Sequence, residues 1–175
     1  MQKAKIIIVT GPSGAGKTTT CRKFLESANG EWAYINQDEI RQLVVAGYES
    51  AGDYTKNWNE KTKKQWEVSI PICADMAKRY NEHTINCIVD IFAPPDEFNE
   101  WKKYLSGVSY ELVVLLPDVH TAVARNASRD KRSRLKENKI RQNHALFESW
   151  LSTGSRVIDN SNTTLDDVID QLRDM

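Results

Sequence analysis

A glycine-rich stretch near the start of the chain contains the residue types that bind phosphate groups. It reads Gly-Pro-Ser-Gly-Ala-Gly-Lys-Thr from Gly11 to Thr18 and matches the spacing G-x-x-x-x-G-K-[ST]. Its glycines let successive backbone N–H groups point at one anion. Lys17 offers a charge to the β- and γ-phosphates of a nucleotide, and Thr18 offers a hydroxyl to Mg²⁺. The stretch predicts a nucleotide site; the alternative is an ordinary glycine-rich turn.

The flanking elements are those that such a loop requires. A β-branched run at Ala4–Thr10 predicts a buried strand before it. A helix is predicted from about Lys17 to Ser27, and the following Asn29 and Gly30 are typical of a helix end. The positive end of this helix would add to the attraction for phosphate.

Two aspartates stand where predicted strands end. Asp38 follows the run at 32–36 and begins a helical segment, and Asp90 lies at the end of the run at 85–91. Because the carboxyl ends of strands carry the ligands in open α/β sheets, Asp38 is expected near a ligand. The alternative is that Asp38 only caps the helix and Arg41 is solvated. Asp90 fits the second nucleotide motif, which orders Mg²⁺ or its water.

The segment from 125 to 141 is the one strongly polarised stretch of the sequence. Against Asp130 and Glu137 it carries eight basic residues, namely Arg125, Arg129, Lys131, Arg132, Arg134, Lys136, Lys139 and Arg141. It predicts either a solvated surface helix or a lid whose arginines close over a triphosphate. In a chain with a phosphate-binding loop we favour the lid.

Strand and helix patterns alternate along the chain, which predicts an α/β fold with a parallel sheet. Further strands are expected at 110–116 and 155–159, and helices at about 54–81, 96–105, 118–134 and 138–151 and after Thr164. Most strands are continuous apolar runs, so helices should cover both faces of the sheet.

The long helical segment has one apolar face, formed by Trp58, Thr62, Trp66, Ile70, Cys73, Ala74 and Ala77. We interpret this face as core. Pro71 is expected to kink or break the segment.

Composition bounds the class of protein. The 175 residues suit one domain over the whole chain, and the net charge of zero gives no general attraction to nucleic acid or membrane. Three cysteines without a C-x-x-C pair argue against a disulfide framework or a zinc site, and Cys21 is expected in the core. A strand begins almost at once, which leaves no room for a signal peptide, and no apolar run approaches a membrane span. We therefore expect a cytoplasmic protein.

In these motifs and in the order of its predicted strands and helices, the chain resembles the P-loop kinases related to nucleoside monophosphate, gluconate and shikimate kinases. The segments that carry the resemblance are Gly11–Thr18, Gln37–Arg41, Val89–Asp90, Pro117–Arg132 and Val157–Ser161. It implies a three-layer P-loop NTPase fold, with a five-stranded parallel sheet in the order 2-3-1-4-5 and a small arginine-rich lid at about 125–141. It also implies ATP and Mg²⁺ as cofactors.

Two subgroups are similar in different places. The segments 34–42 and 124–129 look like phage polynucleotide 5′-hydroxyl kinases, in which the aspartate is the base and the arginine contacts the substrate phosphate. The segment 32–38 is similar to antibiotic phosphotransferases, and 90–96 to small bacterial kinases of that small-molecule sort. The chain lacks the Asp-x-Asp of shikimate kinases, an attached phosphatase domain and an N-K-x-D guanine motif. These departures leave the acceptor open.

From residues and resemblance together we expect the following roles. Nucleotide contacts are assigned to Gly11, Ser13, Gly14, Ala15, Gly16, Lys17, Thr18, Thr19, Arg125 and Arg129. Lys17, Asp38 and Arg129 should be catalytic, with Asp38 as the base and Arg132 as a further lid arginine. Asp38 and Arg41 should contact the acceptor, and Thr18 and Asp90 the metal.

The expected activity is phosphoryl transfer from ATP to a hydroxyl of a small molecule, by a monomer or homodimer. A polynucleotide 5′-hydroxyl kinase and a nucleotide-binding module without transfer activity are the alternatives.

Overall fold

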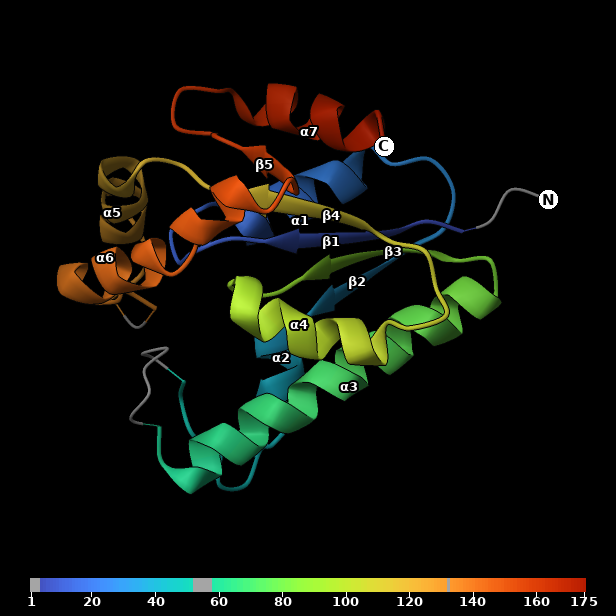
Figure 1. Ribbon diagram of the computed structural model, residues 1–175, viewed down its shortest axis with the longest axis horizontal. Coiled ribbons are helices and arrows are strands. Elements are labelled where there is room, and N and C mark those ends of the chain that lie inside the picture. Colours follow the sequence, from blue (N-terminus) through green and yellow to red (C-terminus); the bar gives the residue numbers. More distant parts are fainter. Residues whose placement is uncertain (1–3, 52–57, 132) are drawn as a thin grey trace.

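Five parallel strands form the centre of the computed structural model, which describes residues 4–51, 58–131 and 133–175 (Figure 1). In sheet order they are β2 (Trp32–Asn36), β3 (Asn86–Asp90), β1 (Ile6–Thr10), β4 (Glu111–Leu115) and β5 (Arg156–Ile158). All neighbouring pairs are parallel. The predicted strand order 2-3-1-4-5 is confirmed.

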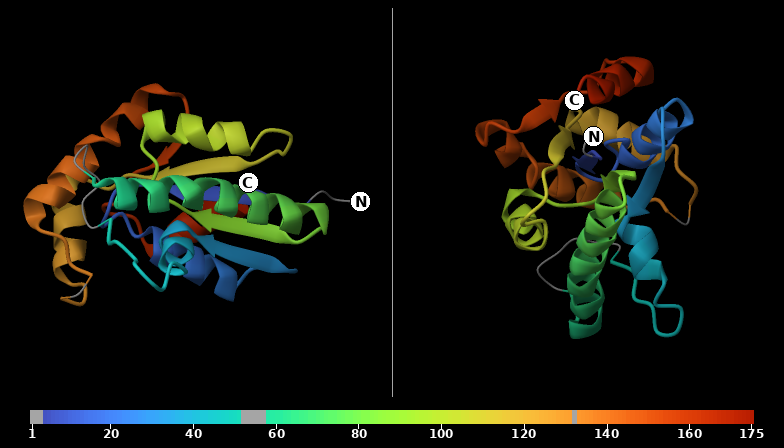
Figure 2. Two further views of the ribbon diagram at one scale, coloured as in Figure 1. Left: turned by 90° about the horizontal axis from the view of Figure 1, so that it is seen from below. Right: turned by 90° about the vertical axis from the view of Figure 1, so that its right-hand side faces the viewer.

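The two faces of the sheet are buried against different helices, because successive side chains of a strand alternate between faces. Ile6 and Ile8 of β1 pack in the core that contains Trp66 of α3 (Glu60–Glu82) and Trp101 of α4 (Pro95–Tyr104). Ile7 and Val9 pack instead with side chains of α1 (Lys17–Glu26) and α7 (Leu165–Arg173). Figures 1 and 2 show the resulting layers of helix, sheet and helix. The continuous apolar runs are explained by this two-sided burial.

The remaining helices are short and lie near the carboxyl ends of the strands. They are α2 (Gln37–Gln42), α5 (Val119–Ala127), α6 (Glu137–Ala145) and the 3₁₀-helix η1 (Glu148–Ser152). In Figure 1, α5 and α6 stand beyond the ends of β1 and β4. Asp118 caps α5 by accepting a hydrogen bond from the Thr121 N–H, and Thr164 and Asp167 form a capping box at the start of α7. Within the described residues, no helix is long and apolar enough to cross a bilayer.

Three predictions about helices are wrong. Pro71 does not break the long segment, because α3 runs unbroken from Glu60 to Glu82. Its inner face, including Ile70 and Cys73, is buried, and this packing offsets the roughly 3 kcal/mol cost of an internal proline. The predicted start of the segment at 54–57 lies outside the described residues.

The other two concern the second half of the chain. The helix expected at 138–151 is divided into α6 and η1. The helix expected to carry the arginines ends at Ala127. Of the described basic residues between 125 and 141, Arg125 therefore lies in α5, Lys139 and Arg141 lie in α6, and the others lie between the two helices. Arg132 lies outside the described residues.

All three cysteines are free and buried. Cys21 packs against the sheet as predicted. Burial raises the pKa of each thiol, to about 12 for Cys73 and Cys87. The described cysteines are therefore core residues with little thiolate character.

Candidate active site

The phosphate loop (Gly11–Thr18) is wedged between the end of β4 and the start of α5. Gly14 has φ +87°, and a Cβ there would lie 2.4 Å from the Ala122 carbonyl oxygen. A Cβ at Gly11 would lie 2.3 Å from the carbonyl oxygen of Leu115. Because both neighbours are backbone atoms, neither position accepts a side chain without moving an element. The glycines thus allow the loop to pack closely as well as to turn.

Lys17 folds back over the loop. Its Nζ donates to the carbonyl oxygens of Gly11 at 2.8 Å and Pro12 at 3.3 Å, and it lies 5.9 Å from the centre of the Phe92 ring. Burial lowers the pKa of Lys17, and the nearby carboxylate of Asp90 opposes that shift. These hydrogen bonds hold the Lys17 ammonium at the loop where a phosphate group would bind.

Thr18 and Asp90 lie together at the end of the loop. The Thr18 hydroxyl donates to Oδ2 of Asp90 at 2.7 Å. The same oxygen accepts from Tyr34 Oη at 3.0 Å and from Asn36 Nδ2 at 2.9 Å. Burial raises the pKa of Asp90, against the lowering effect of Lys17 and of these hydrogen bonds. Burial likewise raises the pKa of Tyr34, so its hydroxyl stays a donor.

A hydroxyl and a carboxylate oxygen are the donor types that Mg²⁺ prefers, so Thr18 and Asp90 fit the expected metal. Among the described residues, no three His, Cys, Asp or Glu side chains come together as a cation site.

A cavity of about 390 Å³ opens on one side of the loop, and we call it the α1–α7 cavity. It is lined by Gly14, Gly16, Thr19, Thr20, Arg125, Ser128, Arg129, Asn160, Thr163, Leu165 and Val168. Asn160 Nδ2 donates to the Ala15 carbonyl oxygen at 2.9 Å. The backbone carbonyl oxygen of Asn160 accepts from Arg125 Nη2 at 2.7 Å. Arg125 also reaches the Ala15 carbonyl at 3.4 Å. Arg125 and Asn160 together hold the phosphate loop through their hydrogen bonds to the Ala15 carbonyl oxygen.

A second cavity, of about 450 Å³, opens on the other side, and we call it the α2–α6 cavity. It is lined by Ser13, Asp38, Arg41, Gln42, Tyr48, Ser50, Ala51, Trp66, Phe92, Arg129, Ser133, Arg134, Leu135 and Asn143. Asp38 lies at its rim with 69% of its side chain exposed. The N-cap of α2 is Asn36, which accepts from the Glu39 N–H at 3.0 Å. The capping alternative for Asp38 is therefore wrong.

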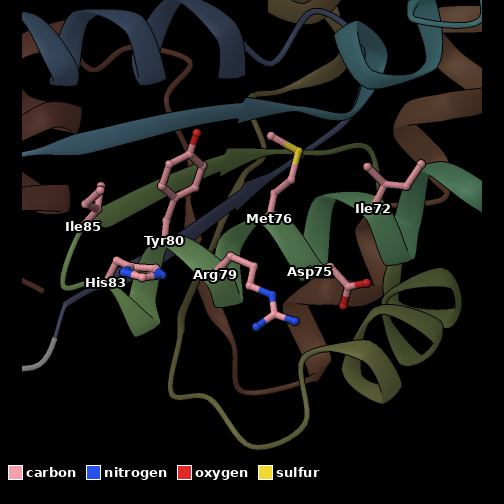
Figure 3. A pocket seen from close by; sticks show the side chains of 7 residues that line it. All are labelled: Ile72, Asp75, Met76, Arg79, Tyr80, His83 and Ile85. Atoms are coloured by element: carbon pink, nitrogen blue, oxygen red, sulfur yellow. The ribbon is translucent and has the colours of Figure 1, made fainter.

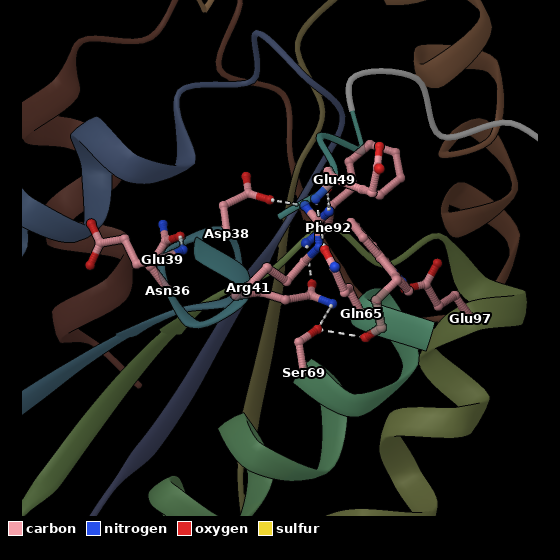
Figure 4. Close-up of polar contacts among 11 residues, drawn as sticks. Asn36, Asp38, Glu39, Arg41, Glu49, Gln65, Ser69, Phe92 and Glu97 are labelled. Carbon is pink, nitrogen blue, oxygen red and sulfur yellow. Dashed lines mark hydrogen bonds and ion pairs between the residues drawn. The ribbon is translucent and has the colours of Figure 1, made fainter. Parts of the chain in front are cut away.

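Arg41 is buried rather than solvated, with 2% of the residue exposed. Its guanidinium donates to the Glu49 carbonyl oxygen at 3.0 Å and pairs with Asp38 at 3.4 Å (Figure 4). It lies 5.1 Å from the centre of the Trp66 ring and 5.7 Å from that of Tyr48. Within the described part of the chain, the Nε of Arg41 has no hydrogen-bond partner. The Arg41 guanidinium thus lies in the wall of the α2–α6 cavity, and its ion-pair partner among the described residues is Asp38.

Arg129 borders both cavities. It is exposed and lies in the segment between α5 and α6. Asn126 fastens this segment, because its side chain donates to the Leu135 carbonyl at 2.8 Å and accepts from the Leu135 N–H at 3.1 Å. Arg134 adds a hydrogen bond to the Arg129 carbonyl at 2.9 Å. The stretch between α5 and α6, which we call the arginine-rich loop, is thus joined near its two ends by the Asn126–Leu135 hydrogen bonds.

Apart from Arg132, which lies outside the described residues, the predicted site residues lie at the phosphate loop or in the two cavities beside it. Thr19 lines the α1–α7 cavity, and Ser13 lines the α2–α6 cavity and accepts from Asn143 at 3.3 Å. Sequence reasoning missed Tyr34, Asn36, Gln65 and Asn126, whose amide or hydroxyl groups hold the site. No motif marks them, and only the position of Asn36 at the end of β2 is a signal.

A further hollow, of about 540 Å³, lies away from this region. Figure 3 shows it beside the second half of α3, lined by Ile72, Asp75, Met76, Arg79, Tyr80, His83 and Ile85. Ile85 precedes β3, so the hollow is at the amino ends of the strands, opposite the phosphate loop. It contains no predicted site residue.

Several solved structures have the same fold as this chain. A sugar kinase from Janibacter sp. HTCC2649 superposes with a TM-score of 0.68 at 14% identity, over 97% of this chain and 92% of that one. A tunicamycin resistance protein of Deinococcus radiodurans has a TM-score of 0.67 at 17% identity, over 98% and 94%. The shikimate kinase of Acinetobacter baumannii, in complex with shikimate, has 0.67 at 13%, over 97% and 91%. The chain has the P-loop kinase fold of the nucleoside monophosphate and shikimate kinase group, as the resemblance implied.

The family follows from the sequence match. The model of the AAA domain family matches residues 6–150, and the chain belongs to that family. No curated protein matches the chain significantly.

Proposed function

We propose that the protein transfers the γ-phosphoryl group of ATP to a hydroxyl of a small molecule. The proposal rests on Arg129, which borders the cavities on both sides of the phosphate loop. Lys17 is close enough to Arg129 for their charges to interact, so both would act on a phosphoryl group that passes between the cavities. Positive charge placed there favours a transition state whose charge is spread over the phosphoryl oxygens.

The α1–α7 cavity is the proposed ATP site. Backbone N–H groups from Gly11 to Thr19 would face the phosphates, and Arg125 would hold the loop that receives them. Thr18 and Asp90 would hold Mg²⁺. When bound, that ion neutralises phosphate charge, and Lys17 adds a second positive charge on the same groups.

The α2–α6 cavity is the proposed acceptor site. Asp38 lies at its rim and would accept the proton of the attacking hydroxyl. Arg41 would position the acceptor from the wall of the cavity. A volume of about 450 Å³ suits a small molecule, which is why we favour such an acceptor over a polynucleotide. We also propose one kinase domain over residues 1–175, with the segment 125–141 as its lid.

A transfer screen with radiolabelled ATP and Mg²⁺ tests the proposal. Acceptors are nucleosides, sugars, hydroxylated antibiotics and a 5′-hydroxyl oligonucleotide. We expect label on a small molecule, and loss of that label in Lys17→Ala. Label on the oligonucleotide alone, with binding that weakens steeply with salt, would instead support a polynucleotide kinase. ATP binding without transfer to any acceptor would support the binding-module alternative.

A further inference from the structure

The segment between α2 and α3 forms part of the α2–α6 cavity. Of its described residues, Tyr48, Ser50 and Ala51 line that cavity. The segment has no helix or strand from residue 44 to residue 51, so its own backbone does not fix its position. Contacts from the neighbouring helices must do so.

Gln65 of α3 makes two hydrogen bonds to the backbone of this segment. Its Oε1 accepts from the Glu49 N–H at 2.9 Å, and its Nε2 donates to the Gly47 carbonyl oxygen at 2.9 Å. Gln65 is buried, with 7% exposed. Both polar ends of its amide are thus paired with backbone, and a buried amide that lost these partners would leave unsatisfied groups on both sides.

The peptide groups of Glu49 connect Gln65 to Arg41. The N–H of Glu49 is bound by Gln65, and its carbonyl oxygen accepts from Arg41 Nη2 at 3.0 Å. Arg41 in turn pairs with Asp38 at 3.4 Å. Figure 4 shows this row of contacts, from α3 through the segment to α2. Tyr48, whose ring lies 5.7 Å from the Arg41 guanidinium, belongs to the same segment.

Arg41 depends on these contacts because it is buried with little counter-charge. Among the described residues its one ion pair is with the exposed Asp38 carboxylate, and its Nε has no hydrogen-bond partner there. A buried cation without a full counter-ion moves toward solvent unless dipoles and rings hold it. The Glu49 carbonyl and the Tyr48 ring supply part of that hold, and Gln65 fixes both.

We propose that Gln65 is a positioning residue of the acceptor site. By fixing residues 47–49, it seats Arg41 beside Asp38 and sets the wall of the cavity that receives the acceptor. The seating of Arg41 is a property of the protein alone, whereas its effect on catalysis rests on the proposed function. The two parts are tested separately.

The first test needs no acceptor. Phenylglyoxal modifies accessible arginines, and the modified sites are mapped by mass spectrometry in wild type, Gln65→Met and Gln65→Asn. Gln65→Met keeps the size but loses both hydrogen bonds; Gln65→Asn keeps the amide on a side chain too short to reach both partners. We expect Arg41 to react about tenfold faster in Gln65→Met, together with faster amide exchange over 44–51.

The matched control is Lys61→Ala. Lys61 reaches the side chain of the same Glu49 at 3.3 Å, but the pair is exposed and leaves the backbone untouched. Arg41 should stay protected in this variant. Unchanged Arg41 reactivity in both Gln65 variants, or an equal increase in Lys61→Ala, overturns the proposal. If Gln65→Met does not fold, Gln65→Asn decides.

The second test uses the best small-molecule acceptor from the transfer screen. We expect Gln65→Asn to raise the KM for that acceptor about tenfold, with the KM for ATP changed less than about twofold. A variant that was only destabilised would lose activity without a selective rise in the KM for the acceptor. Equal effects on both KM values overturn the catalytic part. If wild type labels no acceptor, the proposed function fails, and the Arg41 reactivity still decides the role of Gln65.

Discussion

The Thr18 hydroxyl lies 2.7 Å from Oδ2 of Asp90, although the two residues are 72 positions apart in the sequence. Thr18 is at the start of α1 and Asp90 is the last residue of β3, and β3 pairs directly with β1. The pairing brings the end of β3 beside the phosphate loop that follows β1. The fold therefore makes neighbours of the two oxygen ligands expected for Mg²⁺.

Asp90→Asn should separate nucleotide binding from its dependence on Mg²⁺. The side chain keeps its size and loses the charge that favours a divalent cation. We expect ATP affinity in the presence of EDTA to stay within about twofold, while the gain on adding Mg²⁺ and the turnover both fall, the turnover by about 10²-fold. Calorimetric titration with ATP in both conditions measures this. An unchanged gain from Mg²⁺ would show that another group orders the metal.

Asp38→Asn should lower turnover without weakening ATP binding. A general base contributes about 10²- to 10⁴-fold, and Asn cannot accept the proton. Glu39→Gln is the matched control, because Glu39 is the next carboxylate along α2 and is exposed in a pair with Arg22. Transfer rates to the best acceptor give the comparison. Full activity in Asp38→Asn would rule out the base assignment.

The two lid arginines should differ in their effects. Arg125 is tied to the Ala15 and Asn160 carbonyls, so Arg125→Lys should mainly raise the KM for ATP. Arg129 borders both cavities, so Arg129→Lys should mainly lower kcat, by about 10²-fold. Arg141→Lys, on the exposed face of α6, should change neither parameter. Steady-state kinetics at varied ATP decides, and the reverse pattern would exchange the two roles.

Asn126→Leu should release the arginine-rich loop. The variant keeps the side-chain size but loses both hydrogen bonds to Leu135, which should cost about 1–3 kcal/mol of folding free energy. Tryptic cleavage after Arg129 and Lys131 should become faster, and kcat should fall more than ATP affinity. Chemical denaturation, timed proteolysis and kinetics measure these effects. Ser128→Ala, which removes one exposed hydroxyl bond from the same loop, should cleave at the wild-type rate.

Asp118 should make stability depend on acid pH. Hydrogen bonds from the Thr121 N–H and hydroxyl and from the Ser161 hydroxyl hold the pKa of Asp118 well below its usual range. Its stabilising contribution is complete above the unfolded pKa, and it is lost as the pH falls from about 4 toward the lower folded pKa. Melting temperatures of wild type and Asp118→Asn should therefore converge as the pH is lowered. A constant difference across this range would contradict the prediction.

Much of the fold could be predicted because its sheet is buried on both sides. Each strand is then a short apolar run such as Ile6–Val9, which stands out without knowledge of its neighbours. Helices were harder to predict where tertiary packing overrides local preference. α3 continues through Pro71 because its inner face is buried, and α5 ends at Ala127, where Asn126 instead binds Leu135.

The sequence by itself determined the phosphate loop, the strand-end aspartates and the strand pattern, because these depend on residue types at fixed spacings along the chain. Only the tertiary structure decided how the two sides of the loop are built. It buried Arg41 against Trp66, exposed Asp38 and placed Arg129 between two cavities. It also showed the buried amides of Gln65, Asn126 and Asn160 bound to distant backbone. An amide that pairs with backbone needs only a partner at the right distance, and no local spacing in the sequence records that distance.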